Sequence, residues 1–145
     1  MKTDHLYSIL CWSILTFLVS CTNNNEGEVD LLISSPESIT LEGETYLLNG
    51  FLLDNEGSIN GFAELVKENE TRIEASVEIV NIFILEGTQV YRSSAVIAMN
   101  PTDFFTLMSR AEQLPDWVLE APIQMVIEVR VGSDTFLLRD AEVEQ

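Results

Sequence analysis

Residues 123–131 read IQMVIEVRV, and this stretch decides the fold. Every second residue from Ile123 to Val131 is apolar, and polar or charged residues fill most of the positions between them. A period of two is typical of a strand that turns one face to the core and the other to solvent. The sequence therefore predicts an antiparallel β-sheet protein.

Elsewhere the clearest alternation runs from Arg72 to Ile79, where the odd-numbered residues are apolar and the even-numbered ones polar. Turn residues at 54–57, 68–70, 86–87 and 132–134 separate most of the shorter candidate strands. Those candidates are residues 39–41, 46–53, 59–67, 82–85, 90–99 and 135–143. Strands at this spacing predict one mainly β domain over residues 37–145, an antiparallel β-sandwich or open barrel.

One segment, residues 101–113, is predicted as a short α-helix. Asn100 and Pro101 suit the N-cap and the first helical position. Apolar residues then recur at helical spacing, at Phe104, Leu107, Met108 and Ala111. We expect this apolar face to cover an edge or an open end of the sheet.

The first 20 residues have the pattern of a signal peptide. Lys2 precedes a mostly apolar run of 14 residues, Leu6 to Val19. A membrane-spanning helix needs about 20 residues, so the run has the length of a signal-peptide core.

The run ends in Leu18, Val19, Ser20 and Cys21, which resembles the lipobox of bacterial lipoproteins. The resemblance implies cleavage between Ser20 and Cys21 and a diacylglyceryl group on the Cys21 thiol. Two or three acyl chains would hold the protein at a membrane, since each buried methylene contributes about 0.8 kcal/mol. The alternatives are an ordinary secretory leader and an uncleaved anchor.

Residues 21–36 are predicted to be the acylated cysteine and a flexible tether, because 22–28 are polar and lack apolar periodicity. Thr22, in place of aspartate, resembles the sorting signal for the outer membrane. The acidic residues Glu26, Glu28 and Asp30 resemble surface-export tethers. We therefore expect an exported protein, lipid-anchored at the outer membrane, with its periplasmic or surface orientation left open.

The chain is strongly acidic, with 24 Asp and Glu against 7 Lys and Arg and a net charge of −17. Lys2 and Asp4 cancel within the leader, so the predicted mature part keeps that charge. Nucleic-acid phosphates and anionic lipid headgroups would both be repelled. We expect no nucleic-acid partner, and membrane attachment through acyl chains on Cys21 alone.

Few catalytic or metal-binding residue types follow the leader. The only histidine is His5, and the two cysteines are Cys11 and Cys21. This excludes Ser-His-Asp and Cys-His nucleophiles and the usual zinc, copper and haem ligands from the mature part. Lys67, its only lysine, is expected to be solvated beside the acidic turn at 68–70. We expect no enzymatic activity, no cofactor and no metal.

Two local features keep alternatives open. The loop 54–60 offers oxygen ligands for calcium, but Ile59 stands where an EF-hand requires glycine, which favours a simple hairpin turn. Trp117 lies in an apolar stretch between two prolines and is either a recognition anchor or a plug over the core, the second being favoured.

Three stretches, residues 57–65, 71–79 and 95–103, resemble chordin-type CHRD domains, which are β-sandwiches distantly similar to copper, zinc superoxide dismutase. The resemblance implies a sandwich fold. Histidines that such domains often place after the second strand are missing, so it carries no metal site to this chain.

The function that these observations favour is a lipid-anchored, non-enzymatic binding or structural module of the cell envelope. One alternative is an accessory subunit of an envelope complex, with an exposed apolar patch around Trp117 or on the predicted helix. Another is a small calcium- or carbohydrate-binding domain.

The lipid anchor predicts the effect of Cys21→Ser. We expect this variant to move from the detergent phase to the aqueous phase, or to accumulate unprocessed, because the acyl acceptor is gone. Detergent phase separation and immunoblotting measure this. Cys11→Ser is the control, since Cys11 leaves with the leader; unchanged partitioning of Cys21→Ser would contradict the assignment.

Overall fold

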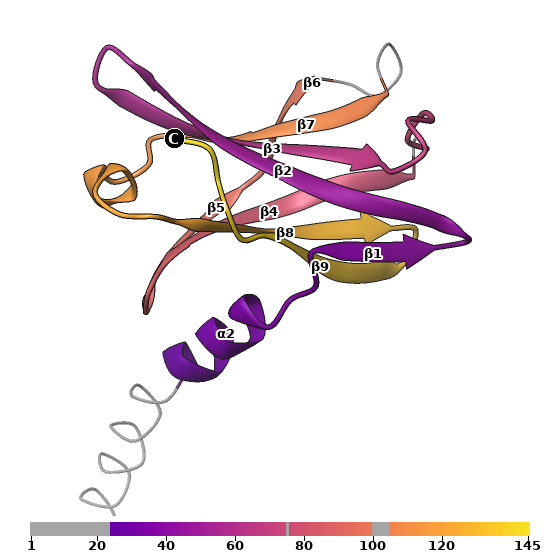
Figure 1. The fold of residues 1–145 in the computed structure, drawn as a ribbon, viewed down its shortest axis with the longest axis horizontal. Coiled ribbons are helices and arrows are strands. Elements are labelled where there is room, and N and C mark those ends of the chain that lie inside the picture. Colours follow the sequence, from indigo (N-terminus) through magenta and orange to yellow (C-terminus); the bar gives the residue numbers. More distant parts are fainter. Residues whose placement is uncertain (1–23, 75, 100–104) are drawn as a thin grey trace, which may run out of the picture.

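Two antiparallel β-sheets packed face to face make up the domain (Figure 1). The structure is a computed structural model, and it describes residues 24–74, 76–99 and 105–145. Its elements in chain order are α2 (Asn24–Ile33), β1 (Ser38–Leu41), β2 (Glu44–Asn55), β3 (Ser58–Lys67), β4 (Val77–Glu86), β5 (Gln89–Ser94), β6 (Val96–Met99), β7 (Thr106–Ala111), the 3-10 helix η1 (Asp116–Leu119), β8 (Gln124–Val131) and β9 (Asp134–Asp140).

Sheet A has the strand order β1-β2-β3-β7-β6, and sheet B has the order β5-β4-β8-β9. All the strand pairs in both sheets are antiparallel. The predicted β-sandwich is therefore confirmed. The 90–99 candidate is two strands, because the chain crosses from sheet B to sheet A at Ala95.

The core lies between the sheets and follows the alternation of β8. Met125, Ile127 and Val129 are fully buried there and pack against inward residues of β3 and β4. Gly61 allows the sheets to approach closely, since a Cβ at this position would lie 3.0 Å from Ile84 Cδ1. The tight hairpin between β2 and β3 depends on positive φ angles at residues 56 and 57.

The strand predicted over residues 72–79 is wrong for its first half, because β4 begins only at Val77. Ile73 is buried all the same, reaching the core from the connection before β4. Beyond Val77 the strand runs on to Glu86, through a bulge between Ile79 and Asn81. The bulge inserts one residue, so the core-facing positions change from odd to even numbers. The strands predicted over residues 72–79 and 82–85 are therefore parts of one strand.

The helix predicted over residues 101–113 is also wrong where the structure describes it, because Thr106–Ala111 is strand β7. Asn100 to Phe104 lie outside the described residues. β7 pairs with β3 on one side and β6 on the other, and these long-range hydrogen bonds override a helical pattern of only a few residues. In β7 the polar Ser109 faces the core and the apolar Met108 faces outward. The strand therefore lacks the regular alternation of apolar and polar residues in its sequence.

The segment predicted as a flexible tether contains α2. Leu32 is 2% exposed and Val29 is also buried, and Leu32 packs on an outward-facing apolar patch of sheet B. That patch consists of Phe83, Leu85 and Val126, with Val90 and Leu137 beside it. Within the described ranges, no helix is long and apolar enough to cross a membrane.

Arg139 on β9 fixes the chain that follows α2. Its backbone N–H donates to the Pro36 carbonyl at 2.8 Å, and its Nε donates to the Ser35 carbonyl at 3.1 Å. Its guanidinium also pairs with Glu37 at 2.9 Å. These bonds join the segment after α2 to the edge strand of sheet B, so the helix has a defined place on the domain.

The docking of α2 predicts unequal effects at two adjacent leucines. Leu32→Ala should lower the free energy of unfolding by about 2 kcal/mol, because it leaves a cavity over sheet B. Leu31→Ala is the matched control, since this side chain is 59% exposed, and should change it by less than about 0.5 kcal/mol. Urea unfolding measures both; equal losses would contradict the docked helix.

Candidate functional site

The residues singled out from the sequence do not form one site. Leu18, Val19, Ser20 and Cys21 lie outside the described residues. Trp117 belongs to η1, half-buried and packed against the main core, beside the fully buried Val118. This position favours the interpretation of Trp117 as a plug over the core.

The loop proposed for calcium is a hairpin turn. Asp54 Oδ1 accepts a hydrogen bond from the Gly57 backbone N–H at 3.2 Å, so that carboxylate takes part in the turn itself. In the part of the chain that the structure describes, no group of three or more Asp, Glu, His or Cys residues is placed to hold a metal ion. The loop therefore provides a tight connection between β2 and β3.

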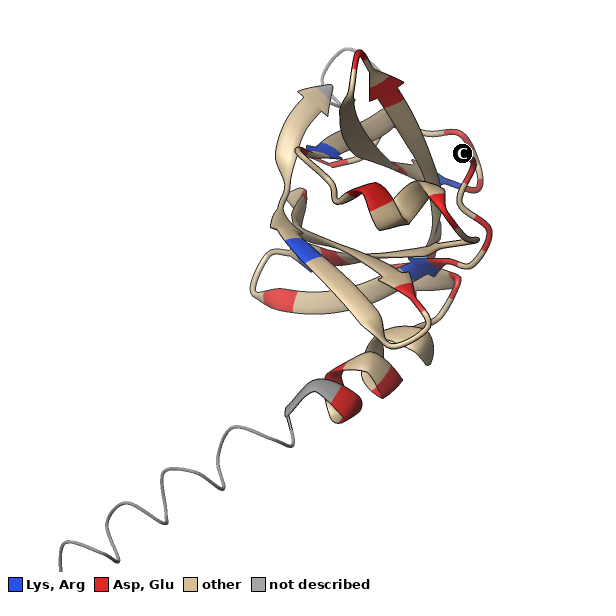
Figure 2. Ribbon diagram, turned by 90° about the vertical axis from the view of Figure 1, so that its left-hand side faces the viewer, with Lys and Arg blue, Asp and Glu red and all other residues tan. Residues whose placement is uncertain are grey.

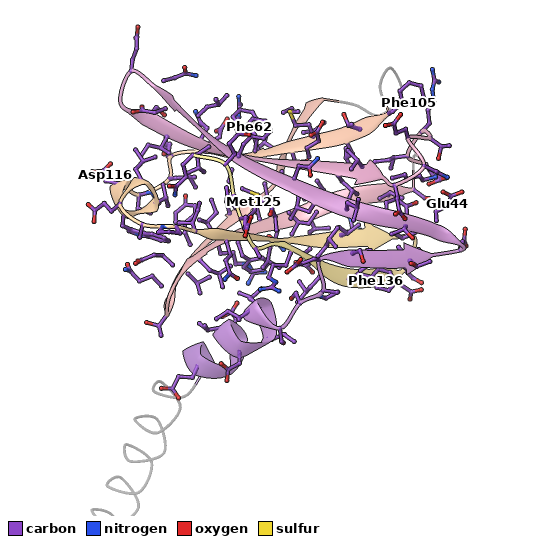
Figure 3. The ribbon with its side chains drawn as sticks, viewed as in Figure 1. Glu44, Phe62, Phe105, Asp116, Met125 and Phe136 are labelled. Carbon is purple, nitrogen blue, oxygen red and sulfur yellow. The ribbon has the colours of Figure 1, made fainter. Side chains whose placement is uncertain are left out.

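The outer face of sheet A carries apolar side chains that α2 does not cover. We call its apolar residues the outer strip: Leu47, Phe51, Leu53, Phe62, Val66, Val96, Phe105 and Met108. Phe105 is 58% exposed, and Leu53 and Val96 are each 45% exposed. Figure 3 shows Phe62 and Phe105 on the side of this sheet that faces away from the second sheet, whereas Met125 lies between the two. The strip residues other than Leu53, Val96 and Phe105 are half-buried.

Strand register places the strip residues of β2 and β3 next to one another, whereas Arg110 of β7 lies between Phe62 and Val96. Leu47 is opposite Val66, and Phe51 is opposite Phe62, across the β2–β3 pair. The rings of Phe51 and Phe62 stack with centroids 5.2 Å apart and planes inclined by 6°. Asn49 and Glu64 lie between these two apolar pairs, so a polar contact divides the strip into two apolar halves.

A groove of about 440 Å³ lies at one end of the strip. Leu47, Val66 and Phe105 contribute its apolar side chains, and Glu68 and Glu70 contribute two carboxylates. Neither carboxylate forms an ion pair within the described ranges. Lys67 also lines the groove, but it is paired with Glu74. The groove therefore combines an apolar surface with two carboxylates that have no ion-pair partner among the described residues.

Lys67 is buried, so the prediction of a solvated lysine is wrong. It is 4% exposed and points inward from the end of β3. Its Nζ donates to Glu74 Oε1 at 2.6 Å and lies 5.7 Å from the centre of the Tyr46 ring. The acidic turn that follows Lys67 in sequence is not its partner; Glu74, seven residues away, is.

Tyr46 completes this buried cluster. Its hydroxyl donates to Glu74 Oε2 at 2.9 Å. Burial of the Tyr46 hydroxyl, and then its hydrogen bond to Glu74, raise the pKa of Tyr46 far above 10.0. The Lys67 hydrogen bond is the main cause that lowers the pKa of Glu74 below 4.5. The phenol thus stays neutral and the carboxylate charged, an arrangement that joins β2, β3 and the following connection.

Sequence reasoning missed the outer strip because its residues alternate with the core residues of the same strands. In β2 and β3 both faces carry apolar side chains. Their sequences therefore resemble those of strands that are buried on both faces of a sheet. The signal that was available is Phe51 and Phe62, which flank the predicted turn at 54–57 at matching hairpin positions.

Charge is spread unevenly over the surface. Figure 2 shows acidic residues on α2, in loops and at strand ends, with only a few basic residues among them. On sheet A the basic residues are Lys67, which is buried, and Arg110, which pairs with Glu112. The outer face of sheet A therefore has little positive charge of its own.

Comparisons with known protein families, with curated proteins and with solved structures find no match.

The buried cluster predicts that Glu74→Gln destabilises the fold by about 1–3 kcal/mol at pH 7, since it removes the charge that faces Lys67. The loss falls below that of a fully buried pair because the Glu74 side chain is 54% exposed. Glu78→Gln is the control, because its partner Arg130 is at the surface, and should cost less than about 1 kcal/mol.

The effect of Glu74→Gln should also depend on pH. The lowered pKa of Glu74 means that its carboxylate contributes stability above pH 4.5, and that this contribution is lost as the pH falls through the folded-state pKa. Urea unfolding at pH 7 and in the acid range measures the difference from wild type. A difference that does not shrink in acid would contradict the ion pair.

Proposed function

We propose that this chain is an exported, lipid-anchored, non-enzymatic binding module of the cell envelope, and that it binds through the outer strip of sheet A. The observation that carries the proposal is the contrast between the two outer faces. α2 covers the apolar patch of sheet B, whereas apolar residues of sheet A such as Leu53, Val96 and Phe105 remain open. Contiguous exposed apolar side chains are a feature of interaction sites.

The position of α2 supports a defined orientation at the membrane. Cys21, the proposed acylation site, precedes Asn24 by three residues, a distance of at most about 10 Å along the chain. Since α2 packs on the outer face of sheet B, the anchor attaches on that side of the sandwich. The outer strip then faces away from the bilayer, where a partner can reach it.

The residue composition supports a binding role over a catalytic one. No histidine follows His5 and no cysteine follows Cys21, so nucleophile–base pairs of the common types have no residues to form them. The one buried lysine, Lys67, is held by Glu74. An accessory subunit of an envelope complex would also be a binding protein. In that alternative the contact surface would be the outer strip of sheet A, and not the surroundings of Trp117.

Energy transfer to lipid tests the orientation. A fluorophore on Leu31→Cys, at the exposed side of α2, is compared with one on Leu53→Cys on the outer strip, each in acylated protein reconstituted in vesicles that contain acceptor-labelled lipid. Transfer should be stronger from residue 31, because α2 lies next to the anchor. The non-acylated Cys21→Ser chain is the control and should show no transfer.

Equal transfer from the two positions, or stronger transfer from residue 53, would contradict the proposed presentation of the outer strip. A free domain on a long tether would average the two distances. A domain lying with sheet A on the bilayer would reverse their order.

A further inference from the structure

We propose that the partner of the outer strip is an extended polypeptide segment that carries apolar side chains at positions i and i+4 and lysine or arginine at i+2, all on the face that contacts the strip. This inference rests on the proposed function and names the chemistry of the partner. It is based on two properties of the outer strip, its two apolar halves and the groove with two carboxylates at one end, and on the negative charge of the whole domain.

The spacing of the strip fits an extended chain. The apolar halves, Leu47 with Val66 and Phe51 with Phe62, are separated along the strands by the polar pair of Asn49 and Glu64. Side chains on one face of an extended segment recur about every 7 Å, since each residue rises about 3.3 Å. Such a segment can contact both apolar halves and meet Glu64 between them.

The charges favour a basic segment. Glu68 and Glu70 line the groove beside Phe105, and neither is in an ion pair among the described residues. The net charge of −17 attracts a cationic partner at long range. The same charge opposes a second copy of this chain on the strip, because two such surfaces would repel each other.

The stacked rings argue against a sugar as the occupant. Phe51 and Phe62 turn their flat faces toward each other, with planes inclined by only 6°. One face of each ring is therefore taken up by the other ring. A pyranose ring stacks on an aromatic face, whereas aliphatic side chains pack equally well against edges.

The test uses the chain from residue 21 onward with Cys21→Ser, which contains every described element. The probe is a fluorescent nonapeptide in which lysine alternates with valine or phenylalanine along the odd-numbered positions, which share one face of an extended chain, and the even-numbered positions are threonine. Two comparison peptides carry glutamate in place of lysine, or serine in place of the apolar residues. Fluorescence anisotropy should show binding of the first peptide only. Raising the salt concentration from about 50 to about 200 mM should weaken that binding by at least roughly threefold, because salt screens the ionic contacts.

Two variant pairs locate the site. Phe105→Ser should weaken binding about tenfold, whereas Leu119→Ser, also at an exposed apolar residue but on η1, should change it less than about twofold. The double change Glu68→Gln and Glu70→Gln should weaken binding several-fold and reduce its salt dependence. Glu120→Gln with Glu142→Gln alters the net charge equally at exposed sites away from the groove and should have little effect.

Other outcomes overturn the partner chemistry and are distinguishable from failure of the proposed function. Equal binding of the glutamate peptide would exclude a basic partner. Sedimentation that shows a dimer lost in Phe105→Ser would assign the strip to a second copy. Phe105-dependent binding to phosphatidylcholine vesicles would assign it to lipid. Each of the first two leaves the strip as a binding face, whereas the third also contradicts the orientation away from the bilayer.

Discussion

The insertion of Leu32 into the apolar patch on the outer face of sheet B determines how the molecule is organised. A sandwich buries the inner faces of its two sheets, so apolar residues on an outer face need a separate cover. On sheet B that cover is α2, and Phe83, Leu85 and Val126 are buried beneath it. The hydrogen bonds of Arg139 to the segment after α2 hold the helix in that position.

This arrangement makes the two outer faces unequal. The face of sheet B is closed by the helix next to the proposed acylation site, and the face of sheet A carries open apolar side chains. Acidic residues surround both faces, and their charge opposes self-association through the exposed Phe105. In the proposed function, the apolar side chains of sheet A would provide affinity and the negative charge would select a basic partner.

The sequence predicts the sandwich because period-two alternation survives in most strands, above all in β8 and in the β2–β3 hairpin. It misplaces β4 because the bulge at Val80 reverses the alternation, and it misses β7 because Ser109 is buried while Met108 faces outward. α2 lacks apolar periodicity, so only its contact with sheet B explains it. Lys67 is misjudged because its partner Glu74 comes from a connection, which local charge patterns do not reveal. The lipobox assignment stays a prediction.

The central claim is that one outer face is covered by α2 and the other is open. NMR relaxation by a soluble paramagnetic agent tests it directly, using methyl and aromatic signals of the chain from residue 21 onward with Cys21→Ser. The account predicts that Leu32 and Val126 are protected while Leu31, Leu53 and Phe105 relax strongly. Relaxation of the Leu32 methyls as fast as those of Leu31, or protection of Leu53 and Phe105, would contradict it.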